Sequence, residues 1–64
     1  MCQMSVVLEK DGQQEKIMDN VTKLEVVGNG VTIATLFEQP QELADTVVKS
    51  IDFMDNLVVL VPAM

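Results

Sequence analysis

Short apolar runs separated by tight-turn residues constrain this chain more than any other feature of its sequence. The runs are bounded by Asp11-Gly12, Asp19-Asn20, Gly28-Asn29-Gly30 and Asp55-Asn56. These residue types tolerate positive φ and suit tight hairpins. The runs between them are rich in β-branched side chains, which favour strands. The sequence therefore predicts an all-β fold, a small antiparallel barrel of five to six short strands.

A chain of 64 residues has room for one domain, which we expect to span residues 1–64. The core must be built mainly from Val, Leu, Ile and Met, because the chain has only two aromatic side chains, Phe37 and Phe53. We expect both phenylalanines to lie in that core. One cysteine excludes an internal disulfide and a four-cysteine zinc module. The absence of histidine excludes a catalytic triad built by one chain. We therefore expect no enzyme.

Alternation assigns the faces of the strands. Along residues 4–9, Met4, Val6 and Leu8 share the predicted core face. Near the end of the chain, Val47, Ile51 and Phe53 share another apolar face. Lys49 falls on that face, which predicts an irregular or bulged start to this strand. For residues 40–49, an extended loop or strand is favoured over a single helical turn.

Five valines fall on faces that alternation gives to solvent. For a domain this small, the economical explanation is a homodimer in which a second subunit covers them. The alternative is that both faces are partly buried within one barrel. The five are Val7, Val27, Val48, Val59 and Val61.

Charge and hydropathy limit the partners and the compartment. Ten acids against four lysines give a net charge of −6, which should repel phosphate backbones, so nucleic acid is not an expected partner. No apolar run approaches the roughly 18 residues of a membrane span, and the N-terminus lacks the pattern of a secretory signal. A single free thiol suits a reducing compartment, so we expect a cytoplasmic protein.

Cys2 is the strongest candidate for a metal ligand in this sequence. Its thiolate, the Met1–Cys2 amide nitrogen and the Met1 amine can close two fused five-membered chelate rings on one metal ion. Soft sulfur with nitrogen donors in a tetragonal arrangement suits Ni(II) or Cu(II). If Met1 were removed, Cys2 would offer its own amine and thiolate, and two subunits could complete an N₂S₂ plane. The structural alternative is that Cys2 is a small hydrophobe in a strand.

The order of short motifs along the chain resembles that of the CooT family. The matching segments are Met1-Cys2 before a strand, Leu8-Glu9-Lys10-Asp11-Gly12, Thr35-Leu36-Phe37, and Ile51-Asp52-Phe53 before a last apolar strand. The resemblance implies an SH3-like β-barrel, a homodimer, and Ni(II) bound through the cysteine that follows the initiator methionine. That residue is Cys2, with nitrogen donors at Met1. The implied function is a metallochaperone for maturation of a nickel enzyme such as carbon monoxide dehydrogenase, which with other maturation proteins would be its partner.

Two other functions compete with nickel binding. One is a metal-free protein-interaction module, which would dock a partner on an edge strand or on the valine surface. The other is a small RNA-binding barrel, which needs a basic groove and stacking aromatics. Four scattered lysines and two phenylalanines placed in the core supply neither.

Overall fold

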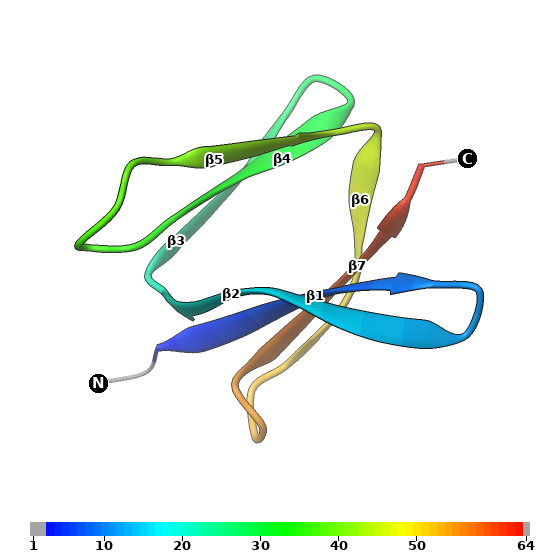
Figure 1. The fold of residues 1–64 in the computed structure, drawn as a ribbon, viewed down its shortest axis with the longest axis horizontal. Coiled ribbons are helices and arrows are strands. Elements are labelled where there is room, and N and C mark those ends of the chain that lie inside the picture. The colour runs from blue at the N-terminus through cyan, green and yellow to red at the C-terminus, as the bar shows by residue number, and fades with distance from the viewer. Residues whose placement is uncertain (1–2, 64) are drawn as a thin grey trace.

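The computed structural model describes residues 3–63, which form seven strands (Figure 1). The all-β class is therefore confirmed, with more strands than expected. Within residues 3–63, no helix has the length and hydropathy needed to cross a bilayer. The strands are β1 (Met4–Lys10), β2 (Gln13–Val21), β3 (Lys23–Val27), β4 (Gly30–Ala34), β5 (Gln41–Ala44), β6 (Thr46–Asp52) and β7 (Leu57–Pro62).

Hydrogen bonding divides the described strands between two open sheets. One sheet has the order β2-β1-β7-β6 and the other β3-β4-β5. We expected one closed antiparallel barrel, and the pairing differs from it in two respects. The strands of the two sheets do not join into a ring, and β1 pairs with β7 in parallel, from Ser5 opposite Leu57 to Leu8 opposite Leu60.

The chain crosses between the sheets at two single residues. Thr22 lies between β2 and β3, and its amide donates to the carbonyl of Ala34 at 2.9 Å. Asp45 lies between β5 and β6 with a φ of 54°. Its carbonyl accepts from the amide of Ala63 at 2.8 Å, and its carboxylate accepts from Asn29 Nδ2 at 3.1 Å. Such short crossings hold the two sheets face to face.

The core lies between the two sheets. Its buried members come from both of them, and Met4 and Leu8 of β1 pack against it. The predicted core face of the first strand is thus confirmed. Burial of each such aliphatic side chain contributes about 1.5–3 kcal/mol. The buried cluster consists of Val6, Val21, Val31, Ile33, Val58 and Leu60.

Most of the predicted turn residues adopt the backbone that their chemistry allows. Asp11, Gly12, Gly28 and Asn56 have positive φ in the links between strands. The segment 19–20 differs, because it lies inside β2, where Asn20 has a φ of 59° beside register shifts in the β1–β2 pairing. It is a local irregularity of a strand and not a hairpin turn.

The segment 40–49 is extended, as favoured from the sequence. It contains β5 and the first part of β6, and the register of β6 against β7 shifts between Val48 and Ser50. Lys49 is the residue that has no partner in β7 at this shift, so the predicted bulge is confirmed.

The faces expected near the chain's end are wrong. Val47 and Ile51 are half exposed, whereas Val48 packs against the core. Phe53 lies beyond the end of β6 in the β6–β7 turn and is exposed. Phe37 is also exposed, in the loop after β4, so the expectation that both phenylalanines are core residues is wrong.

The surplus valines are partly accounted for within one chain. Val7 and Val59, which pair across β1 and β7, are only 8% and 6% exposed. Both faces of the central strands are therefore covered without a second subunit, as the alternative to the dimer proposed. Val48 and Val61 are half-buried and Val27 is exposed, so these three do not decide between the explanations.

Candidate functional site

The predicted metal ligands Met1 and Cys2 lie outside the described residues. The structure describes the place from which they extend, which is the start of β1. Gln3 is exposed there and Met4 begins the strand. The described groups nearest to these ligands along the chain are those at the start of β1.

The start of β1 is held between two other strands. Met4 lies opposite Val21 of β2, and Ser5 lies opposite Leu57 of β7. The Ser5 amide donates to the carbonyl of Asn56 at 2.9 Å, which ties β1 to the β6–β7 turn. Because both neighbours contact the first residues of the strand, its direction is fixed at this point.

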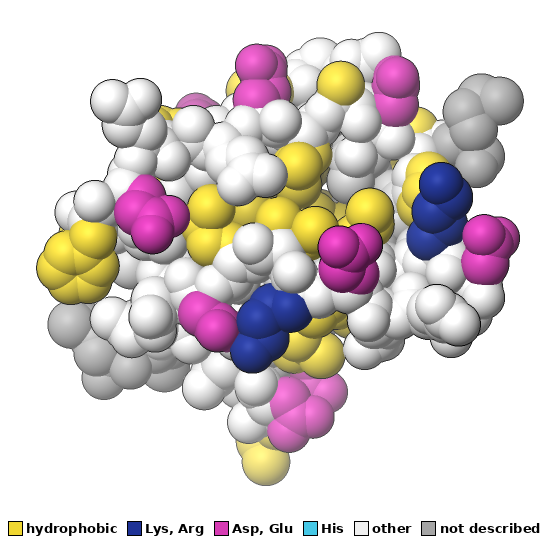
Figure 2. Space-filling model, in the orientation of Figure 1, with side chains coloured by type: hydrophobic (Ala, Val, Ile, Leu, Met, Phe, Trp, Pro, Cys, Tyr) yellow, Lys and Arg dark blue, Asp and Glu magenta, His cyan; other side chains and the backbone are white. Residues whose placement is uncertain are grey.

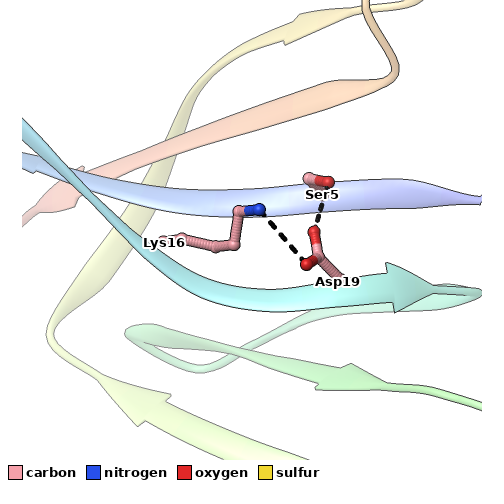
Figure 3. Close-up of polar contacts among 3 residues, drawn as sticks. All are labelled: Ser5, Lys16 and Asp19. Atoms are coloured by element: carbon pink, nitrogen blue, oxygen red, sulfur yellow. Dashed lines mark hydrogen bonds and ion pairs between the residues drawn. The ribbon is translucent and has the colours of Figure 1, made fainter.

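A second tie at the same residue is polar (Figure 3). Ser5 Oγ donates to Asp19 Oδ1 at 2.7 Å, and Lys16 Nζ lies 3.2 Å from Asp19 Oδ2. The Ser5 hydroxyl and then the Lys16 ammonium lower the pKa of Asp19 below its ordinary value. Asp19 is consequently ionised at neutral pH beside the start of β1.

The remaining described groups do not form a second candidate centre. Within residues 3–63, no group of three or more His, Cys, Asp or Glu side chains is placed to hold a metal ion. Lys49 Nζ contacts both carboxylate oxygens of Glu9, at 3.0 and 3.1 Å, and this contact lowers the pKa of Glu9. Glu9 is at the far end of β1 from Met4, so this pair is remote from the candidate site.

Two open depressions border the β1–β2 turn, with volumes of about 470 and 530 Å³. They share Lys10 and Asp11, and the side chains around the first are mostly polar. They lie at the opposite end of β1 from Met4. Neither depression therefore contributes to the candidate site.

The sequence reasoning missed the groups next to the start of β1. The Ser5–Asp19 contact joins residues 14 positions apart, and it depends on the irregular register of β2. A serine next to the predicted ligand segment and an acid within a turn signal were the available clues. They did not specify a pair.

Comparison with known proteins gives a family and a fold. A family model described as CO dehydrogenase accessory protein CooT matches residues 1–61. A crystal structure described as CooT from Carboxydothermus hydrogenoformans superposes with a TM-score of 0.84 at 20% sequence identity. The alignment covers 95% of this chain and 97% of that chain. At this identity the structural likeness supports the fold alone. No curated protein matches this chain.

Proposed function

This chain belongs to the CooT family of CO dehydrogenase accessory proteins, and on that premise we propose that it binds Ni(II) as cargo for maturation of a CO dehydrogenase. The family match begins at residue 1, so Cys2 lies within the matched segment. That match is the observation that carries the proposal. We further propose that the protein acts in the cytoplasm, where a lone thiol stays reduced.

The proposed donors are the Cys2 thiolate with the nitrogens at Met1, the amine and the Met1–Cys2 amide. This set suits Ni(II), which accepts sulfur and nitrogen ligands in a planar arrangement. The described structure supports it by the way in which β1 begins. Ser5 is tied to both neighbouring strands, and three Cα–Cα steps of about 3.8 Å separate it from Cys2. The thiolate is therefore tethered within a short reach of a fixed point.

We propose that two chains share one nickel ion through both Cys2 thiolates, and that one of the two N-terminal nitrogens of each chain completes a plane of two sulfurs and two nitrogens. A homodimer requires a surface that a second copy can cover, and β6 offers one. It is an edge strand of the four-stranded sheet, with Val47 and Ile51 half exposed. The two-fold symmetry of a dimer would present the two N-termini equivalently. The valine pair inside the chain, Val7 and Val59, no longer supports this proposal.

The charges disfavour the RNA-binding alternative. Three lysines lie near acids: Lys16 with Asp19, Lys23 with Glu25 and Lys49 with Glu9, at 3.2, 3.8 and 3.0 Å. These pairs offset the positive charge that a phosphate backbone needs, in a chain whose net charge is −6. Exposed phenylalanines could stack on bases, but without a basic groove they do not make an RNA site.

The test is a Ni(II) titration of the reduced, tag-free protein, followed by absorption in the thiolate-to-metal charge-transfer region. We expect a band that saturates at one nickel per two chains and is absent from Cys2→Ser. The matched control moves the thiol instead of deleting it. In Cys2→Ser combined with Gln13→Cys, the sulfur stands at an exposed position at the start of β2, opposite Lys10 and away from the proposed dimer surface on β6. This position separates the sulfur from the terminal nitrogens, and no band of the wild-type affinity is expected.

Other outcomes contradict defined parts of the proposal. Saturation at one nickel per chain would keep nickel binding and reject the shared site. Equal binding by the Gln13→Cys control would reject the N-terminal nitrogen donors. Loss of folding in Cys2→Ser would make Cys2 a packing residue. The absence of any band in the wild type would reject nickel binding by this chain.

A further inference from the structure

Two turns of this protein are built in the same way. Thr35 Oγ1 accepts hydrogen bonds from the amides two and three residues later, Phe37 and Glu38, at 3.1 and 3.0 Å. Asp52 Oδ1 does the same with Met54 and Asp55, each at 3.0 Å. Side chains that bind nearby amides in this way fix the backbone of a turn. The four-residue patterns are Thr-Leu-Phe-Glu (35–38) and Asp-Phe-Met-Asp (52–55), and we call these segments the paired turns.

Each of the paired turns exposes two large apolar side chains. Leu36 and Phe37 are 70% and 83% exposed, and Phe53 and Met54 are 79% and 93% exposed. An acidic residue follows each pair. In Figure 2, hydrophobic side chains protrude at the left and at the bottom of the molecule, where Figure 1 places the β4–β5 loop and the β6–β7 turn. Acidic side chains lie near both protrusions (Figure 2).

The paired turns lie on either side of the start of β1. The first turn follows Ala34, whose carbonyl accepts a hydrogen bond from the amide of Thr22. The residue before Thr22 is Val21, which lies opposite Met4 at the start of β1. The second leads to Asn56, whose carbonyl accepts from Ser5. Figure 1 shows the N-terminal end of β1 with the β4–β5 loop on one side and the β6–β7 turn on the other. A partner that contacted both turns would be centred on the start of β1.

The size of this surface fits a transient partner better than a second copy. A phenylalanine presents about 150 Å² or somewhat more of contact surface, so two phenylalanines with a leucine and a methionine offer roughly 500 Å². A stable dimer covers about 800 Å² on each partner, whereas transient complexes fall below that. The largest exposed apolar patch on a typical monomer is about 300–600 Å² and is often functional, and the paired turns together reach that size.

The charges also disfavour a second copy. Glu38 and Asp55 are exposed beside the apolar pairs, and the chain carries −6 overall. Two copies meeting through these turns would bring like charges together, which costs free energy at an interface. A surface whose apolar centre is bordered by Lys and Arg would instead be attracted.

We propose that the paired turns are the docking surface for the enzyme that receives the nickel, through an apolar patch on that enzyme bordered by basic residues. This inference rests on the proposed nickel function, because it is the metal at the N-terminus that gives docking there a purpose. The turns would contact the client on both sides of the start of β1. The N-terminal donors would thereby be held against the client while the metal is transferred.

The test measures binding of purified, nickel-free CO dehydrogenase to the full chain by biolayer interferometry. The variants are Phe37→Ser, Phe53→Ser and the double variant, each of which replaces an exposed side chain and should leave the fold intact. Val26→Thr is the matched control, because Val26 is 68% exposed but lies on β3 near the Gly28 turn, away from the paired turns. Nickel stoichiometry and molar mass by light scattering are measured on every variant.

We expect each phenylalanine variant to weaken client binding about tenfold and the double variant about a hundredfold, as for separated interface anchors. Val26→Thr should bind as the wild type does, and raising the salt concentration should weaken wild-type binding. All variants should keep the wild-type nickel titration and molar mass.

Several results would overturn the docking surface. They are wild-type affinity in the double variant, an equal loss in Val26→Thr, no wild-type binding to the enzyme, binding insensitive to salt, or a lower molar mass in the double variant. The last would assign the turns to a dimer. If the wild type bound no nickel while client binding still depended on both phenylalanines, the nickel function would fail and the surface would stand.

Discussion

Gly30 should be among the least replaceable residues of this fold, for reasons of space. A Cβ added there would lie 2.3 Å from the carbonyl oxygen of Leu43 and 3.1 Å from the Cα of Ala44. Both are backbone atoms of β5, which pairs with β4 at this point. An ordinary van der Waals contact begins near 3.4 Å, whereas the added Cβ would lie 2.3 Å from the Leu43 oxygen. The strands must therefore separate by about 1 Å, the difference between 3.4 and 2.3 Å.

A separation of this size breaks the hydrogen bonds at this end of the β4–β5 ladder. Loss of about two such bonds, at roughly 1 kcal/mol each, together with overpacking of about 1–3 kcal/mol, gives about 3–5 kcal/mol for Gly30→Ala. A chain of this length has roughly 3–10 kcal/mol of stability in total, so the variant should be at the margin of folding. Its Tm should fall by roughly 12–40 °C, at about 4–8 °C per kcal/mol.

Gly28→Ala is the matched control, two residues away. Gly28 has a φ of +53°, but a Cβ there would meet nothing within 4 Å. Its cost is backbone strain of about 1–2 kcal/mol, partly offset by the lower entropy of the unfolded chain. Thermal and urea unfolding followed by circular dichroism, at one protein concentration, measure both variants. If Gly30→Ala destabilised the protein no more than Gly28→Ala, the close approach of β4 and β5 would be refuted.

Two other changes test the core and the anchor of β1. Leu60→Ala removes a fully buried side chain from β7 and should cost about 2–5 kcal/mol in urea unfolding. Asp19→Asn should lower stability at pH 7, because the folded-state pKa of Asp19 lies below its ordinary value of 3.8 and the ionised form is the one that Ser5 and Lys16 bind. That contribution is present above the ordinary pKa and is lost as the pH falls through the lowered one, so the two proteins should converge in stability in acid. A difference that stayed constant from pH 7 down to strongly acidic pH would contradict this account.

The local features of the fold followed from the sequence because they depend on neighbouring residues. Turn residues with a tolerance for positive φ marked the links between strands, and Asp11 and Asn56 adopt that backbone. The bulge at Lys49 followed from a charged residue at an apolar position of a strand. Such signals need no knowledge of which strands pair.

The pairing of the strands did not follow, because alternation specifies a face and not a neighbour. Nothing within residues 4–8 or 57–60 indicates that they pair in parallel, since the segments are about 50 positions apart. The crossing at Asp45 was also hidden, because no glycine or proline marks it. Its only clue was the tolerance of aspartate for a left-handed backbone, stabilised by contacts to Asn29 and Ala63 that arise in the fold.

The errors at Phe37 and Phe53 have a different cause. An aromatic side chain in an aliphatic sequence was assigned to the core on hydrophobicity alone. Both phenylalanines instead follow a short side chain that accepts hydrogen bonds from the turn, Thr35 or Asp52. The pattern of one such side chain, two apolar residues and an acid was visible in the sequence. Only the fold shows that both copies are turns that lie beside the start of β1.

The structure separates what holds the fold together from what the proposed function requires. The buried cluster around Val6, Ile33 and Leu60 lies between the sheets, whereas the paired turns and the start of β1 lie at one end. Exposing four large apolar side chains there favours self-association, and a net charge of −6 opposes it by repulsion between copies. Since the exposed phenylalanines, the only aromatic residues of the chain, add little to the core, a binding role explains them better than stability does.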